Sequence, residues 1–137
     1  MVSLSEIIDA YYFVNVSSYG SNRAILCKDT GRILYRSEEA GIDEVADQDL
    51  DWENCIEIPH KYDLNLDREL VFEFVEMYLP DEYHRVRQMF RKRGAYSRYK
   101  RFLESRGMLD TWYEFENERE EHALRQWCKE NGIELSG

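Results

Sequence analysis

The spacing of apolar residues changes near residue 65, and this change limits the folds that the chain can adopt. Before it, residues 23–28 and 32–36 are short runs rich in aliphatic side chains, and they are joined by a turn that contains Gly31. Two such runs predict an antiparallel hairpin. After it, apolar residues recur every three to four positions, which predicts helices. Strands in one half and helices in the other are typical of the α+β class.

Two further elements are predicted in the N-terminal half. Ser3 and Glu6 have the spacing of a capping box, in which each side chain bonds a backbone amide of the other residue. We therefore expect a helix over residues 4–12. Residues 55–58 form a third β-rich run, which ends at Pro59. A two-stranded hairpin alone is marginally stable in water, so we expect the helix and the third run to cover one of its faces.

The C-terminal half is predicted to contain about four helices. Pro80, Gly94 and Gly107 separate them, and Gly132 ends the last one, since glycine suits the left-handed position that follows a helix. Asp110 stands where the last helix would have its N-cap. Residues that share the helical period are expected to form one core: Phe74, Val75, Tyr99, Phe102, Leu103 and Trp127.

The expected architecture is α+β: a small antiparallel β element with an N-terminal helix, packed on a C-terminal bundle of about four helices. A chain of 137 residues fits a single domain. Within it, residues 1–59 would form the helix and β part, and residues 60–137 the helical part.

The sequence predicts a cytoplasmic protein that does not enter a membrane. No apolar run approaches the roughly 18 residues of a membrane span, and the first residues lack the pattern of a secretion signal. The three cysteines, Cys27, Cys55 and Cys128, are widely spaced and odd in number. We therefore expect buried thiols and no disulfide.

Charge is distributed very unevenly along the chain. The net charge is −10, yet residues 84–106, here called the basic segment, hold nine Lys or Arg against the single acid Glu104. The rest of the chain consequently carries −18. Residues 38–57, here called the acidic segment, hold nine acids and no base. Blocks of opposite charge indicate an electrostatic partner or pairing between surfaces of the same chain.

The basic segment contains the candidate binding residues. Gly94 would let the following helix start with free backbone amides, which bind phosphate, and an aromatic ring beside it could stack on a base. The alternative is that the cations pair with acids of the same chain, in the acidic segment or in residues 114–121, or that they cover apolar surface. The candidates are Arg91, Lys92, Arg93, Tyr96, Arg98, Lys100 and Arg101.

Neither a metal nor a cofactor is expected. His60, His84 and His122 lie far apart in the sequence, and zinc needs three or four ligands. The spacing of Asp47, Asp49 and Asp51 is that of a calcium loop, but the loop's glycine and its last glutamate are missing. We expect residues 38–53 of the acidic segment to form a loosely held, solvated loop, because their carboxylates repel one another.

Four short segments together carry a resemblance: Ile58–Asp63 (IPHKYD), Gly94–Lys100 (GAYSRYK), Trp112–Glu116 (WYEFE) and Trp127–Ile133 (WCKENGI). In this order and spacing the chain resembles an uncharacterised bacterial protein family that has no assigned function. The resemblance spans nearly the whole chain and implies a bacterial cytosolic protein. It implies no activity and no site residues.

Three classes of function remain open. The first is a non-catalytic interaction module whose basic segment binds an anionic partner such as a nucleic acid. The second is an acidic adaptor that binds a basic protein through residues 38–57. The third is an enzyme whose site is assembled from distant residues, although no motif identifies catalytic residues. The partner would be a polyanion or a protein, and a homo-oligomer is open as well.

Overall fold

The computed structural model describes residues 1–46 and 48–136, and these residues form two compact units. The first unit contains residues 1–64 together with the chain from Glu121 onward, and the second contains Asn65–Glu120. The long helix α5 (Leu109–Glu130) contributes to both. The boundary therefore follows Leu64 rather than residue 59, and the end of the chain returns to the first unit.

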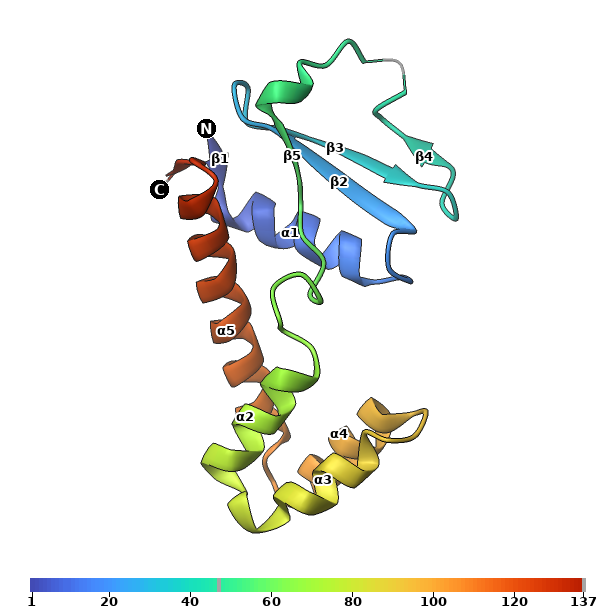
Figure 1. Cartoon of the computed structure of the whole chain (residues 1–137), viewed down its shortest axis with the longest axis vertical. Coiled ribbons are helices and arrows are strands. Elements are labelled where there is room, and N and C mark those ends of the chain that lie inside the picture. Colours follow the sequence, from blue (N-terminus) through green and yellow to red (C-terminus); the bar gives the residue numbers. More distant parts are fainter. Residues whose placement is uncertain (47, 137) are drawn as a thin grey trace. The chain divides into compact units, whose positions relative to one another are not determined.

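The first unit is built on a four-stranded antiparallel sheet (Figure 1). Its order is β4 (Ile42–Asp43), β3 (Arg32–Ser37), β2 (Asn22–Cys27), β5 (Cys55–Glu57). The hairpin lies within one residue of its predicted bounds. We had expected the third run to cover a face of the hairpin, and it does not. It pairs with β2 and extends the sheet, with Leu26 opposite Ile56.

Helix α1 (Leu4–Asn15) packs beside the sheet, and the predicted capping box starts it. The Ser3 Oγ accepts from the Glu6 amide at 3.1 Å, and the Glu6 Oε1 accepts from the Ser3 amide at 3.2 Å. The helix runs three residues further than predicted because its last turn still has apolar contacts: Val14 is buried, and the Phe13 ring meets the edge of Tyr35 at 4.9 Å between centroids. Strands β1 (Val2–Ser3) and β6 (Leu135–Ser136) pair in parallel, which brings the two chain ends together (Figure 1).

The acidic segment has more local structure than we had expected. It contains β4 and the 3-10 turn η1 (Trp52–Asn54). Asp43 Oδ1 accepts from the amides of Val45 and Ala46, and Glu44 Oε1 accepts from the Tyr35 amide at 2.9 Å. Several of its carboxylates thus bind backbone amides, which offsets their mutual repulsion. Asp47, the first residue of the apparent calcium spacing, lies outside the described residues.

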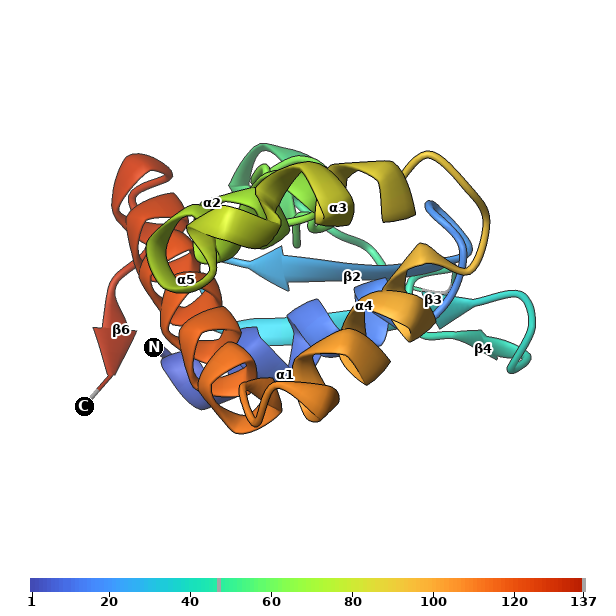
Figure 2. The same ribbon diagram turned by 90° about the horizontal axis from the view of Figure 1, so that it is seen from below.

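The second unit is helical. It consists of α2 (Arg68–Tyr78), the 3-10 turn η2 (Pro80–Glu82), α3 (Tyr83–Met89), α4 (Ala95–Ser105) and the first part of α5 (Figure 2). Pro80 begins η2, and α3 ends five residues before Gly94. Asp110 lies inside the first turn of α5 instead of capping it. Together the two units confirm the α+β class, with one small antiparallel sheet and a helical C-terminal half.

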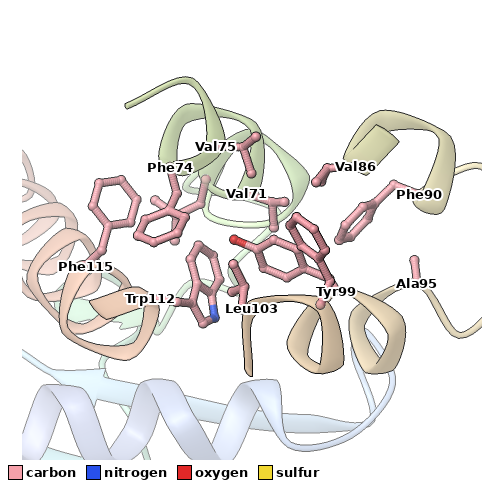
Figure 3. Packing of buried hydrophobic residues seen from close by; sticks show 12 residues of the cluster. Val71, Phe74, Val75, Val86, Phe90, Ala95, Tyr99, Leu103, Trp112 and Phe115 are labelled. Atoms are coloured by element: carbon pink, nitrogen blue, oxygen red, sulfur yellow. The ribbon is translucent and has the colours of Figure 1, made fainter. Parts of the chain in front are cut away.

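An aromatic cluster forms the core of the second unit (Figure 3). The Trp112 ring meets Phe74 at 5.3 Å and Tyr99 at 5.1 Å between centroids, both edge to face. Five of the six predicted core residues belong to this cluster. The sixth, Trp127, was predicted wrongly: it is half-buried, it lies in the part of α5 that belongs to the first unit, and Trp112 supplies the indole of this core.

The fold brings two of the cysteines together. Cys27 and Cys55 are directly opposite each other on β2 and β5, so a pairing that the sequence spacing does not reveal results from the strand register. All three cysteines are free thiols; Cys27 and Cys128 are buried and Cys55 is half-buried.

Among the helices of residues 1–46 and 48–136, none has both the length and the apolar character needed to cross a membrane.

Candidate functional site

The candidate binding residues lie on the turn between α3 and α4 and on α4 itself. Gly94 has φ 73°, and it precedes the helix without a side-chain cap; no acidic residue follows in the first turn. The helix is fixed to the core of the second unit by its apolar face, from which Ala95, Tyr99 and Leu103 are buried. Its remaining faces therefore present the basic side chains.

Three cations of the basic segment make contacts within the second unit. Arg106 and Arg85 both pair with Glu82, at 2.7 and 3.7 Å, and both guanidinium groups lie 5.1 Å from the centre of the Phe102 ring. Arg87 lies 4.8 Å from the centre of the Phe72 ring. Pairing within the chain thus accounts for part of the basic segment, and the acid involved, Glu82, was not singled out by the sequence.

Three of the seven candidate residues make contacts of their own. The Tyr96 hydroxyl donates to Asp67 Oδ1 at 2.6 Å, and its ring stands edge-on to Phe90 at 5.0 Å between centroids. Arg98 Nη2 donates to the Arg93 carbonyl. The Lys100 ammonium lies 5.6 Å from the centre of the Tyr113 ring. Tyr96 is half-buried, so only part of its ring is available for stacking.

The other four candidates are exposed and unpaired. Arg91, Lys92, Arg93 and Arg101 have no ion pair with any carboxylate in the described part of the chain. Residues 91–101 include six cations and no acid. These four exposed cations therefore form a surface whose positive charge is not balanced by ion pairs, on α4 and on the turn between α3 and α4.

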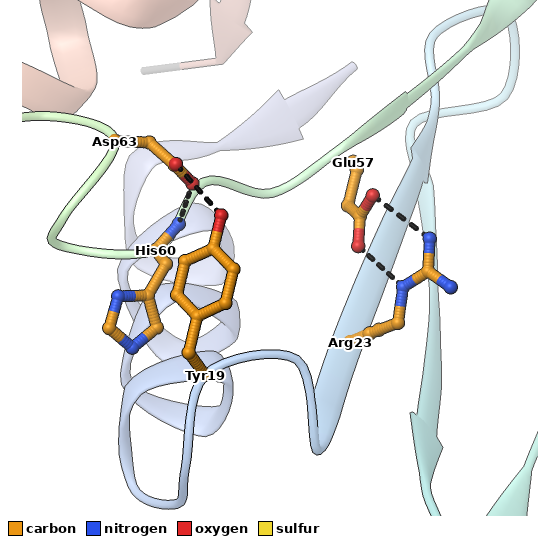
Figure 4. A network of polar contacts seen from close by, with 5 residues as sticks. All are labelled: Tyr19, Arg23, Glu57, His60 and Asp63. Atoms are coloured by element: carbon orange, nitrogen blue, oxygen red, sulfur yellow. Dashed lines mark hydrogen bonds and ion pairs between the residues drawn. The ribbon is translucent and has the colours of Figure 1, made fainter.

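A second polar site, which the sequence did not indicate, lies in the first unit (Figure 4). Arg23 donates to both carboxylate oxygens of Glu57, at 2.6 and 3.0 Å. The Tyr19 hydroxyl donates to Asp63 Oδ1 at 3.1 Å, and this hydrogen bond raises the pKa of Tyr19. These side chains line a cavity of about 360 Å³.

Most polar groups around this cavity form hydrogen bonds or ion pairs with one another. Asp63 Oδ2 accepts from the His60 amide at 2.9 Å, and His60 Nδ1 accepts from the Tyr62 amide at 3.2 Å. The Glu57 carboxylate raises the pKa of Arg23, which stays charged. Asp63 and His60 thus fix the turn that follows β5, and the role of this network is to stabilise that turn. The signal that could have indicated it is the polar IPHKYD segment directly after a strand.

Among residues 1–46 and 48–136, no group of three His, Cys, Asp or Glu side chains is placed to hold a metal ion. His60, His84 and His122, which lie far apart in the sequence, therefore do not meet at one metal site in this part of the chain.

The fold and the site define an α+β protein with an exposed basic surface on its helical unit. Comparison with protein-family models, with curated proteins and with solved structures gives no match.

Proposed function

We propose that this protein is a non-catalytic interaction module that binds a polyanion through residues 91–101 of its basic segment. The observation that carries the proposal is the unpaired state of Arg91, Lys92, Arg93 and Arg101 in a chain that has 28 acidic residues. Like charges this close repel one another, and a bound anion would relieve that repulsion.

The start of α4 adds to the positive potential of this surface. The first amides of a helix have no acceptor within the helix, and the helix dipole places a partial positive charge there. In α4 neither a side-chain cap nor an acidic residue of the first turn offsets it. Arg98, held by the Arg93 carbonyl, adds a further cation beside Gly94. A phosphate group complements this combination of amides and guanidinium groups.

The contacts of Tyr96 favour recognition of phosphate over recognition of bases. Because its hydroxyl is bonded to Asp67 and one ring edge packs on Phe90, Tyr96 offers less surface for stacking than we had expected. Phosphate contacts carry no direct sequence information. We therefore expect the affinity for single-stranded nucleic acid to depend little on base sequence.

The test is a fluorescence anisotropy titration of a labelled single-stranded oligonucleotide at low salt. The Arg91→Glu/Arg101→Glu variant should bind at least about tenfold more weakly than the wild type, since each lost phosphate contact is replaced by repulsion. The matched control is Arg32→Glu/Lys129→Glu, which changes two exposed cations outside the basic segment and alters the net charge equally. Equal losses in both variants would show that net charge, and not this surface, governs binding.

A second candidate function rests on the acidic segment. Trp52 is 59% exposed and offers an apolar anchor that two acids, Asp51 and Glu53, flank in the sequence. Such a surface suits a basic protein partner. If the wild type binds no oligonucleotide at low salt but binds labelled polylysine, and Trp52→Ala weakens that binding, the acidic adaptor replaces our proposal.

A further inference from the structure

Cys27 and Cys55 form a pair of thiols on neighbouring strands. They are Cα partners in the antiparallel pairing of β2 with β5, and their Sγ atoms lie 3.8 Å apart. A disulfide needs both a suitable separation of the two backbones and side chains that point toward each other. The 3.8 Å contact shows that the second condition is met.

The strand register settles the first condition. Lys28, the residue after Cys27, donates its amide hydrogen to the Asn54 carbonyl at 2.8 Å. Hydrogen-bonded and non-hydrogen-bonded pairs alternate along antiparallel strands, so Cys27 and Cys55 occupy a non-hydrogen-bonded position. At such positions the Cα atoms are about 4.5 Å apart, which is at the short end of the roughly 4.4–6.8 Å range of disulfides.

A small oxidant can reach this pair. Cys55 is half-buried while Cys27 is buried, and both line a cavity of about 250 Å³. The third cysteine, Cys128, is buried on α5 and does not line this cavity. An oxidant would therefore meet the Cys55 sulfur first, with the Cys27 sulfur directly behind it.

We propose that Cys27 and Cys55 form a reversible oxidation site, which a small disulfide converts from the dithiol to an intramolecular disulfide. The Cys55 thiolate attacks one sulfur of the oxidant, which forms a mixed disulfide and releases one small thiol. The Cys27 thiolate then attacks Cys55 Sγ, which forms the Cys27–Cys55 bond, breaks the mixed disulfide and releases the second small thiol. Two electrons pass to the oxidant, and the two thiol protons end on the two released thiols.

The position on the strands makes the bond easy to reduce. Cys55 is half-buried, so a reductant can reach the bond from its side, and exposed disulfides are the labile ones. Oxidation also changes a contact of the acidic segment, because the reduced Cys55 donates its S–H to the Asp51 carbonyl at 3.2 Å. The disulfide has no such hydrogen. The pair thereby links the redox state to the anchoring of residues 48–54. This inference is independent of polyanion binding.

The experiment exposes the full chain to oxidised glutathione at about pH 9, because the raised pKa of Cys55 leaves little thiolate near neutral pH, and counts labelled thiols by mass spectrometry. Two of the three thiols should be lost, and the joined Cys27 and Cys55 peptides should be lighter by two hydrogen atoms. Dithiothreitol should restore both thiols, and Cys128→Ser should leave this behaviour unchanged. Retention of all three thiols, or a bond between two chains in place of the intramolecular one, would overturn the proposal.

The Cys27→Ser variant tests the order of attack. Without the second thiol, the glutathione adduct should persist on Cys55, and its absence would exclude Cys55 as the residue that reacts first with the oxidant. Hydrogen exchange tests the coupling to the acidic segment. Exchange over residues 48–54 should be faster in the disulfide form, and identical exchange in both forms would contradict the link through Asp51.

Discussion

The Tyr99 hydroxyl is a polar group buried in the apolar core of the second unit. Tyr99 is fully buried between the rings of Phe90 and Trp112, and within the described part of the chain its hydroxyl has no hydrogen-bond partner. Burial raises the pKa of this phenol well above its usual value. A buried hydroxyl without a partner costs free energy on folding.

Tyr99→Phe is therefore expected to raise the free energy of unfolding, by about 1 kcal/mol. The matched control is Tyr96→Phe, which removes the hydrogen bond to Asp67 and should lower stability by a similar amount. Urea denaturation of both variants measures the two effects. A loss of stability in Tyr99→Phe would show that the hydroxyl is satisfied in solution.

A second prediction at this scale concerns the ionisation of Cys55. Burial, and then the neighbouring Cys27, Asp29 and Asp51, raise the pKa of this thiol to about 11. The neutral form consequently persists to high pH, and only the thiolate reacts with iodoacetamide. The alkylation rate of Cys55 should rise about tenfold per pH unit from pH 7 to about pH 10. Glutathione, measured alongside, should level off earlier, and a plateau for Cys55 near pH 8 would contradict the assignment.

At the scale of the elements, the capping box of α1 gives a direct test of a local sequence signal. Ser3→Ala removes the acceptor of the Glu6 amide and should destabilise the protein by about 1 kcal/mol. Ser5→Ala is the matched control, because Ser5 is exposed inside the same helix and alanine is the better helix former there. Thermal unfolding of both variants compares them. Equal stability would mean that the capping box contributes nothing.

Local signals predicted most of the elements, and tertiary contacts set what those signals missed. The hairpin and α1 begin where their turn and cap residues stand. The end of α1 depends on the packing of Phe13 against Tyr35, a contact across 22 positions that no local period contains. Likewise, the pairing of β5 with β2 decides that Cys27 meets Cys55.

The sequence was enough to define the basic segment as a candidate site, but not to show which of its residues make contacts within the chain. Counting charges marked residues 84–106, which the structure places on α3, on α4 and on the turn between them. It did not reveal that Glu82 pairs with Arg85 and Arg106, because residues 82 and 106 meet only when α4 packs on the turn before α3. Nor did it show that the hydroxyl of Tyr96 is taken by Asp67.

At the scale of the whole molecule, the sequence period grouped residues that the fold divides between two units. Trp127 shares the helical period of the aromatic core, yet α5 carries it into the first unit. A helical period identifies the buried face of a helix but not the partner of each turn. Because α5 has 22 residues, its first part belongs to the second unit and its last part to the first unit.

Loss of the Phe74 side chain should strongly weaken the second unit. It is fully buried and contacts Trp112 and Phe115, each at 5.3 Å between ring centroids. Phe74→Ala should destabilise the protein by about 3–5 kcal/mol through lost burial and the cavity left behind. Met77→Ala, on the exposed side of the same helix, should change stability by less than about 0.5 kcal/mol. A small effect of Phe74→Ala in urea denaturation would contradict the core described here.

The salt dependence of oligonucleotide binding tests the central claim most directly. Phosphate contacts release counterions, and the logarithm of the association constant falls with the logarithm of salt concentration by about 0.7 for each contact on a single strand. If three to five of the cations in residues 91–101 contact phosphates, the wild-type slope should lie between about −2 and −3.5. The Arg91→Glu/Arg101→Glu variant should show weaker binding and a flatter slope. A wild type that fails to bind at low salt, or that binds with no dependence on salt, would contradict the account.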